Sequence, residues 1–352
     1  MSAGAQLASP TGVRVARSRH PRPATRVIAL AVVAALAVLP ALLGPGVTSK
    51  LADAFVLLAM ASMWNLLAGY AGLVSIGQQA FIGLGAYGLF LMSSLWHLPI
   101  VVAILGTAAF IVGVSLLTAV FVFRLQGGYF AIGTWVIAEV IHLIVAQNRT
   151  LGAGTGTTIQ SLVAMNAADR GALTFWLALL VGFGSVALVA LIMRSRIGLA
   201  LSAVRDSEVA ARSLGVDVFR VKLLIWVIAA AGCGIAGSVA YMQLLRIQPT
   251  AAFGVDWTAR MIFIVVIGGI GRIEGPIVGA IVFFVLQETL AGYGAVYLII
   301  LGSVAIAIAV LAPRGIWGLL SERRRISLFG IDRHLVIGGP APPPGPSTTE
   351  AA

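Results

Sequence analysis

The chain has 352 residues, of which 60% are hydrophobic and 10% carry a charge. Soluble domains carry about a quarter charged residues, so this composition excludes a soluble globule and predicts a membrane protein with several spans. The formal net charge is +11, but in so apolar a chain we expect the basic residues to set orientation in the membrane, not to bind nucleic acid.

The chain begins with a basic tail, residues 1–26, which we expect to be cytoplasmic and disordered. Its five arginines precede the apolar run 27–43, an order that is also typical of a signal peptide. Because the run exceeds the usual signal-peptide core and more apolar runs follow it, we interpret it as an uncleaved first span. A cleaved signal is the alternative.

Ten apolar runs approach the roughly 20 residues that a helix needs to cross the hydrocarbon core. They cover residues 27–43, 51–69, 73–95, 99–122, 129–147, 173–193, 221–245, 257–271, 276–292 and 295–312. The sequence therefore predicts an all-α fold, a polytopic bundle of about ten transmembrane helices in one membrane domain, residues 27–313. The eighth run is short, which indicates a broken or re-entrant segment.

The basic residues predict which side each loop faces. An even number of spans places both termini on one side, and if that side is the cytoplasm, 18 of the 23 lysines and arginines lie inside, as the positive-inside rule expects. The longest outer loop, residues 148–171, has glycines among threonines and is predicted to be rich in turns. The C-terminal tail, residues 314–352, ends in a Pro/Gly-rich stretch that we expect to be disordered.

A glycine-rich segment, residues 64–88, joins the second and third runs. We expect Ser75, Gln79 and Gly83 on one helical face, where they would permit close helix packing with polar cross-links. Packing is the preferred role of the glycines, and direct contact with a ligand is the alternative. Gln78 and Gln79 are candidates for a polar partner or a wet pathway, because an amide in hydrocarbon is otherwise costly.

The fifth run contains two ionisable residues, Glu139 and His142, at a spacing that places them on one helical face. Two such groups without a third candidate are weak evidence for a metal ion, and no metal site is predicted. Glu139 is expected near mid-membrane, either facing a polar pathway or making a polar contact with another helix.

The polar segment 194–222 interrupts the apolar chain and holds nine of its 35 charged residues. The positive-inside count places this segment in the cytoplasm. Asp206 or Ser207 is expected to cap a short helix that runs from Glu208 to Leu214. Gly215 is expected to end this helix in the left-handed conformation.

This segment has two possible roles. Its helix is expected to expose Arg205, Glu208 and Arg212 near one another, with Val209 and Leu214 as apolar anchors. That mixture suits a groove on a partner protein. A solvated connector at the lipid headgroups is the alternative, which composition alone would favour.

The stretch 267–279 contains Gly268, Gly269 and Gly271 and a proline, a density that predicts a helix break between the eighth and ninth runs. Breaks of this kind often line transport sites. The sequence has no G-x-x-x-x-G-K-[ST] loop, so we do not expect the chain to bind ATP in that manner. It also has neither an H-E-x-x-H motif nor a nucleophile elbow, which argues against a membrane enzyme.

Four of these segments resemble the membrane permease subunits of branched-chain amino acid ABC transporters of the LivM type, the LivH/LivM permease family. The polar segment matches the family pattern at Gly198, Ala200, Leu201, Ala203, Arg205, Asp206, Glu208, Ala210, Ala211, Gly215 and Lys222. The glycine-rich segment matches at Asn65, Gly69, Tyr70, Gly72, Ser75, Gly77, Ala80, Phe81, Gly83, Gly85, Ala86 and Tyr87. Many relatives have His at the position of Gln78. The stretches around Glu139 and Gly268 also agree with the family.

The resemblance covers about residues 50–320 and implies an inner-membrane subunit, similar to type II ABC importers, with no enzyme activity or cofactor of its own. The implied partners are a second LivH-type permease, two cytoplasmic P-loop ATPases that bind ATP, an extracytoplasmic substrate-binding protein and the surrounding lipid. The segment 194–222 would be the coupling loop. Its residues implied to act on the ATPase are Arg205, Asp206, Glu208, Arg212, Leu214 and Gly215. The candidates for pathway lining or helix packing are Asn65, Ser75, Gln78, Gln79, Gly83, Glu139, Gly268, Gly269 and Gly271.

The family's usual substrates are Leu, Ile and Val, and relatives with the same loop carry urea, short amides or other amino acids. Two other classes of protein stay open. An ion-coupled secondary transporter would be expected to bury more ionisable residues in its spans, and a membrane enzyme would need a cluster of catalytic residues.

Overall fold

The computed structural model of the chain describes residues 13–17, 23–42, 44–293, 295–312, 315–324 and 333–337. The long helices are α1 (Pro23–Leu42), α2 (Pro45–Asn65), α3 (Gln79–Phe90), α4 (Ile100–Val122), α5 (Gly128–Gln147), α7 (Ala167–Arg194), α10 (Val218–Leu244), α12 (Asp256–Gly268), α13 (Glu274–Leu290) and α14 (Ala295–Leu311). The short ones are α6 (Gln160–Val163), α8 (Arg196–Asp206), α9 (Glu208–Ser213), α11 (Pro249–Ala252) and α15 (Gly315–Arg324). Two π-helical turns, Leu66–Tyr70 and Leu91–Leu95, extend α2 and α3.

The predicted helical membrane architecture is confirmed. Each of the ten apolar runs overlaps one of the long helices. Six helices in the described part of the chain are long and apolar enough to cross a membrane, and they begin at Pro45, Ile100, Gly128, Ala167, Val218 and Pro249. The total of ten spans remains a prediction.

The third run was predicted as one span, 73–95, and this is wrong in its first part because α3 begins only at Gln79. Residues 71–78 form irregular chain. Gly72 has φ +70°, and the N–H of Leu73 donates back to the carbonyl of Leu67. The Ser75 hydroxyl accepts from the N–H of Gly77, a local bond that competes with helix formation. Ser75 therefore does not share a helical face with Gln79 and Gly83.

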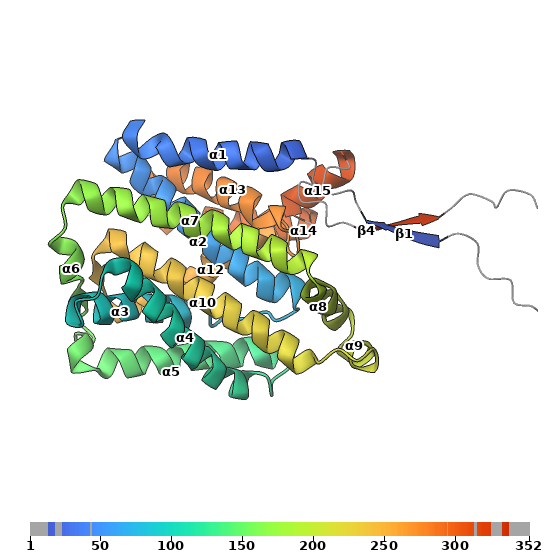
Figure 1. Cartoon of the computed structure of the whole chain (residues 1–352), viewed down its shortest axis with the longest axis horizontal. Helices are drawn as coiled ribbons and strands as arrows, with labels where there is room; N and C mark the ends of the chain where they lie inside the picture. The colour runs from blue at the N-terminus through green and yellow to red at the C-terminus, as the bar shows by residue number, and fades with distance from the viewer. Residues whose placement is uncertain are drawn as a thin grey trace, which may run out of the picture.

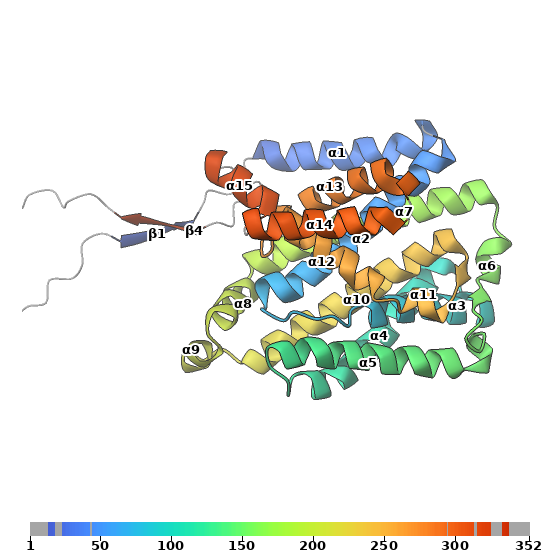
Figure 2. The ribbon, with the colours of Figure 1, turned by 180° about the vertical axis from the view of Figure 1, so that it is seen from behind.

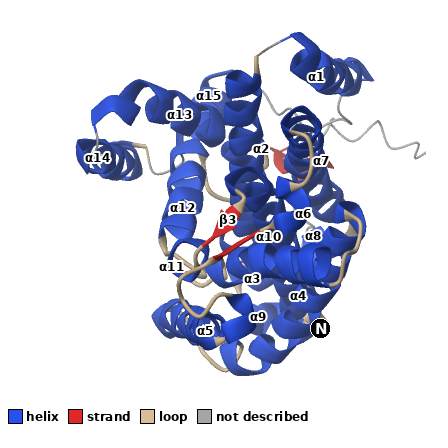
Figure 3. Cartoon of the chain, turned by 90° about the vertical axis from the view of Figure 1, so that its left-hand side faces the viewer, coloured by secondary structure: helices blue, strands red, loops and turns tan. Residues whose placement is uncertain are grey.

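Helices α2 and α10 lie in the middle of the bundle (Figure 3). Helix α2 packs along α7 and α10, and α10 packs against α3 and α4. By contrast α5 and α14 lie at the edge. In the most apolar 18-residue stretch of each helix, 83% is buried for the helix that begins at Pro45 but only 22% for α5. Helix α5 therefore presents most of its surface outside this chain.

The two ends of the bundle differ (Figure 1). At one end, α6 lies near a small sheet in which β2 (Thr157–Thr158) pairs antiparallel with β3 (Arg246–Ile247). The predicted turns of loop 148–171 are found there, since Gly152, Gly154 and Gly156 have positive φ. At the other end lie α8, α9 and α15, with β1 (Val13–Arg17) paired antiparallel to β4 (Arg333–Ile337).

The predicted tails are described only in part. The paired strands β1 and β4, the start of α1 and the helix α15 fall within them. The rest of residues 1–22 and 325–352, including the Pro/Gly-rich end, lies outside the described residues. The pairing of β1 with β4 brings both tails to the end of the bundle that carries α8 and α9 (Figure 1).

Candidate functional site

The polar segment 194–222 folds into two short helices, α8 and α9, at one end of the bundle. The Ser207 hydroxyl caps α9 by accepting from the N–H of Ala210, and Gly215 follows the helix with φ +82°. Both predictions are confirmed. The sequence reading missed α8, which Ser195 caps by accepting from the N–H of Ile197.

A clear sequence signal for α8 was available. The apolar residues Ile197, Leu201 and Val204 are spaced three and four residues apart, which is the period of an amphipathic helix. Leu201 and Val204 are buried in the structure. Charged residues on both sides, Arg194 and Arg196 before it and Arg205 and Asp206 after it, make this short apolar stripe difficult to recognise in the sequence.

Arg205, Glu208 and Arg212 were predicted on one exposed helix; Arg205 is exposed, as predicted, but lies on a different helix from the other two. It belongs to the last turn of α8, whereas the other two belong to α9, and Ser207 between the helices has extended backbone with φ −162°. The Nη1 atom of Arg205 donates a hydrogen bond to the carbonyl oxygen of Gly69, in the π-helical turn that ends α2. The exposed Arg205 thus also bonds the backbone of its own chain.

Glu208 fastens α9 to α10. Its carboxylate, 38% exposed, forms an ion pair with Lys222, whose side chain is only 16% exposed. Arg212 lies 4.0 Å away, on the other carboxylate oxygen. The apolar anchors Val209 and Leu214 are strongly exposed, at 77% and 78%. The end of the bundle therefore presents two large apolar side chains on a helix held by an ion pair.

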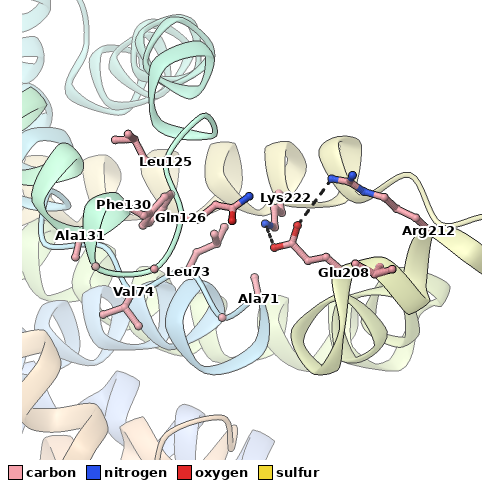
Figure 4. Close-up of a pocket in the computed structure, with 14 residues that line it drawn as sticks. Ala71, Leu73, Val74, Leu125, Gln126, Phe130, Ala131, Glu208, Arg212 and Lys222 are labelled. Atoms are coloured by element: carbon pink, nitrogen blue, oxygen red, sulfur yellow. Dashed lines mark hydrogen bonds and ion pairs between the residues drawn. The ribbon is translucent and has the colours of Figure 1, made fainter.

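A pocket of about 630 Å³ lies beside this ion pair (Figure 4). Three segments contribute to its wall: the irregular chain after α2, the turn between α4 and α5, and the start of α9 with Lys222 of α10. The lining residues are Ala71, Gly72, Leu73, Val74, Leu125, Gln126, Gly127, Gly128, Phe130, Ala131, Glu208, Val209, Arg212 and Lys222. The exposed Val209 thus stands at the edge of a cavity that could receive part of another protein.

Asn65, near the end of α2, holds the turn between α12 and α13. Its side chain is 1% exposed. The Oδ1 atom accepts from the N–H of Gly271 at 2.8 Å, and Nδ2 donates to the carbonyl of Arg272 at 2.9 Å. A Cβ placed on Gly69 would lie only 2.6 Å from the nitrogen of Gly271. The two glycines therefore let the two backbones touch.

The other two glycines of this turn, Gly268 and Gly269, lie in close backbone contacts. A Cβ on Gly268 would meet the carbonyl of Gly275 in α13, and one on Gly315 would fall against Gly269. Gly269 has φ +126° and Gly271 has φ +73°. The predicted break is present, and it brings α12, α13 and α15 together. A pathway-lining role for these glycines stays a prediction.

At the start of α3, Gln79 contacts another helix. Its Oε1 atom accepts a hydrogen bond from the hydroxyl of Thr258 in α12. Gln78 is fully buried. Its Nε2 atom lies 3.5 Å from the Ser75 hydroxyl, and its Oε1 atom has no hydrogen-bond partner within the described residues. Thr258, a polar residue inside the eighth run, was a signal that the sequence reading did not use.

Aromatic packing surrounds Gly83. A Cβ on Gly83 would meet the ring of Phe253. That ring stacks on Tyr87, with 6.0 Å between centroids, and on His142, with 5.6 Å. Gly83 therefore makes room for an aromatic contact between α3, α5 and the residue after α11.

Glu139 lies on the outward side of α5. Its carboxylate is 54% exposed and lies 3.0 Å from Nδ1 of His142. The apolar residues one turn away on each side, Trp135 and Leu143, are also exposed, at 50% and 49%. The predicted spacing of Glu139 and His142 therefore does bring them into contact, with Glu139 exposed and His142 largely buried against Phe253.

The irregular chain 71–78 lies along the same side of the bundle, between α12 and α5 (Figure 2). The N–H of Ile76 donates to the hydroxyl of Thr134 in α5 at 3.1 Å, and the carbonyl of Ser75 accepts from the Trp64 indole at 2.8 Å. We call this side, formed by residues 71–78 and the exposed side of α5, the α5 face.

The family model described as "Branched-chain amino acid transport system / permease component" matches residues 47–311. The chain belongs to this family. It is therefore a transport component and not an enzyme, and with its apolar helices it is a multi-pass protein of the bacterial inner membrane. The matched range contains every candidate residue discussed above.

Several characterised proteins are similar to the chain. The high-affinity branched-chain amino acid transport system permease protein LivM of Escherichia coli is 26% identical over 284 residues, and that of Salmonella typhimurium is 25% identical over the same length. Each alignment covers 72% of this chain and 65% of the relative. The ribose import permease protein RbsC of Escherichia coli is 29% identical over 123 residues, which cover 33% of this chain and 38% of the relative. No solved structure matches the chain.

Proposed function

We propose that this chain is the membrane permease subunit of an ATP-driven importer that carries branched-chain amino acids, Leu, Ile and Val, or related small amino acids across the inner membrane. The observation that carries this proposal is the family match from residue 47 to residue 311. The two LivM proteins are named as permeases of branched-chain amino acid transport systems. They align with far more of the chain than the ribose permease does. This difference favours an amino acid over a sugar.

The end of the bundle with α8 and α9 would face the cytoplasm. The positive-inside count supports this orientation, with ten spans and both tails on the inner side. The position of β1 and β4 at the same end of the bundle as α8 and α9 agrees with it (Figure 1). The sheet of β2 and β3 would then lie outside, where an extracytoplasmic binding protein would deliver substrate.

Energy would come from a separate pair of P-loop ATPases that bind ATP and dock on α9. Exposed large apolar side chains at the rim of a pocket are typical of a site that takes up a partner. Val209 and Leu214 have that exposure, and the pocket of about 630 Å³ lies next to Val209. Closure of the ATPases would move α9, and Glu208 with Lys222 would pass the movement to α10.

The α5 face would line the translocation route against a second, LivH-type permease. Lipid offers no hydrogen bonds, so irregular backbone at membrane depth persists only where protein or water covers it. A carboxylate at mid-membrane is costly for the same reason, by about 2.5–3.5 kcal/mol on insertion scales. Glu139 is exposed on α5, and residues 71–78 contact α5 through the buried Thr134. Lipid would be an unfavourable neighbour for both.

A pull-down tests the ATPase partner. The full chain, purified in detergent from cells that express its own transport operon, is expected to bring a P-loop ATPase with it. Val209→Asp should abolish this capture, because it places a charge in the apolar contact. Val163→Asp is the matched control, since Val163 is 48% exposed on α6 at the opposite end. Equal capture by both variants would exclude α9 as the docking site.

Two alternatives remain for the same chain. The machinery could carry urea or short amides, which binding assays on the partner binding protein would reveal. An ion-coupled secondary transporter would need no ATPase, and transport by the isolated chain along an ion gradient would favour it.

A further inference from the structure

Arg205 meets the membrane part of its own chain where two helices are interrupted. The first interruption is the π-helical turn after α2, where the helix ends and its last carbonyl groups need partners from outside the helix. The guanidinium donates to one of them, the carbonyl of Gly69. The aliphatic part of the side chain passes Gly72, with 3.9 Å between its Cγ and a Cβ built on that glycine.

The second interruption is the turn between α12 and α13, which lies against the same guanidinium. A Cβ built on Gly271 would be 2.7 Å from Nη1 of Arg205 and 3.0 Å from the carbonyl oxygen of Gly69. Asn65 also binds this turn, through the N–H of Gly271 and the carbonyl of Arg272. One arginine thus touches both interruptions, although they are about 200 residues apart in the sequence.

We infer that Arg205 is a positioning residue that acts inside this chain, joining α8 to α2 and to the α12–α13 turn, and not a contact to the ATPase. The inference rests on the proposed function, because it assigns the step by which movement of α8 and α9 reaches the membrane helices. Docking belongs to Val209 and Leu214, which are 77% and 78% exposed. Arg205 and Asn65 carry the movement to α2 and the α12–α13 turn, beside the link from Glu208 and Lys222 to α10.

The chemistry of the two side chains suits this role. A guanidinium has a planar array of donors and stays charged, so it can bond a carbonyl and still pack flat against a glycine backbone. A lysine in its place has one flexible ammonium and cannot do both. Asn65 offers one acceptor and one donor at the same time, which the N–H of Gly271 and the carbonyl of Arg272 require.

The test uses the complete importer in proteoliposomes, with uptake of labelled leucine and ATP hydrolysis measured on one sample. The variants are Arg205→Gln, Asn65→Ser and the double variant. Arg196→Gln is the matched control, an exposed arginine at the first position of the same helix. All values are divided by the amount of folded chain recovered in the membrane.

Arg205→Gln and Asn65→Ser are each expected to retain the ATPase in full amount and to hydrolyse ATP. Leucine taken up per ATP hydrolysed should fall at least about tenfold in each, because movement of α8 and α9 no longer reaches the membrane helices. The double variant should be no worse than the single ones, since both act on one contact. Arg205→Lys should give an intermediate ratio, and Arg196→Gln should match the unmodified chain.

Loss of the ATPase from Arg205→Gln but not from Asn65→Ser would overturn the inference and make Arg205 a docking residue. An unchanged ratio of uptake to hydrolysis in Arg205→Gln would overturn it as well. If Arg205→Gln does not reach the membrane, the ratio of uptake to hydrolysis in Arg205→Lys is used instead. A ratio below that of the unmodified chain supports the inference, and an unchanged ratio overturns it. Failure of the unmodified chain to capture any ATPase would instead be a failure of the proposed function.

Discussion

The backbone N–H of Gly271 donates a hydrogen bond to Oδ1 of Asn65 across 2.8 Å, although 206 residues separate the two in the chain. The same asparagine donates to the carbonyl of Arg272. Backbone groups in a turn between two membrane helices need such partners because lipid supplies none. One buried amide therefore holds the α12–α13 turn against the end of α2.

Asn65→Ala is expected to destabilise the folded chain by about 2 kcal/mol, because it leaves a buried donor and a buried acceptor without partners. Thermal unfolding of the purified complex in detergent measures the loss. Ser62→Ala is the control, since the buried Ser62 hydroxyl bonds only the carbonyl of Leu58 in its own helix. Equal losses for the two variants would show that Asn65 has no special role.

Gly271→Ala is expected to cost about 1–3 kcal/mol, because φ +73° is strained for alanine and its Cβ would press on Arg205. The unfolding temperature should drop. Gly113→Ala in α4 is the matched change, since nothing lies within 4 Å of its Cβ position and alanine is the better helix former. An equally large drop in the unfolding temperature for Gly113→Ala would show that the loss in Gly271→Ala does not come from the α12–α13 turn.

The ion pair between Glu208 and Lys222 is expected to contribute up to about 1 kcal/mol, discounted because the carboxylate is partly exposed. Glu208→Lys and Lys222→Glu should each lower the unfolding temperature, and the double charge reversal should restore part of the loss. Arg220→Ala serves as comparison, because its ion pair with Asp217 is largely exposed, at 84% and 51%. No recovery in the double variant would show that the pair does not hold α9 to α10.

Glu139→Gln is expected to reduce leucine uptake about tenfold, a loss of about 1.4 kcal/mol, while assembly with the other subunits stays complete. The reason is that a carboxylate on the α5 face would act on the route and not on folding. Glu288→Gln is the control, because Glu288 pairs with Lys50 between α13 and α2, away from α5. Unchanged uptake with unchanged assembly would exclude Glu139 from the route.

Much of the fold could be predicted because its signals are local. Apolar runs of span length predicted the long helices, and the side chain of Ser207 and the backbone freedom of Gly215 predicted the ends of α9. The contact between Glu139 and His142 follows from a spacing of three residues on one helix.

The functional contacts could not be predicted because they join distant segments. Nothing near Arg205 in the sequence indicates that its partner is a backbone carbonyl at Gly69, 136 residues away. The irregular chain 71–78 reads as the start of a span, because Leu73, Val74 and Ile76 are apolar. Its contacts with Trp64 and Thr134, together with Gly72 at positive φ and the local bond from Gly77 to Ser75, accompany its irregular conformation.

The most direct test of the central claim is uptake of labelled leucine into proteoliposomes that contain this chain with its neighbouring permease, binding protein and ATPases. The account predicts uptake only when ATP and the ATPases are both present, and predicts its loss in the Val209→Asp variant. Uptake by the chain without any ATPase, driven by an ion gradient, would contradict it.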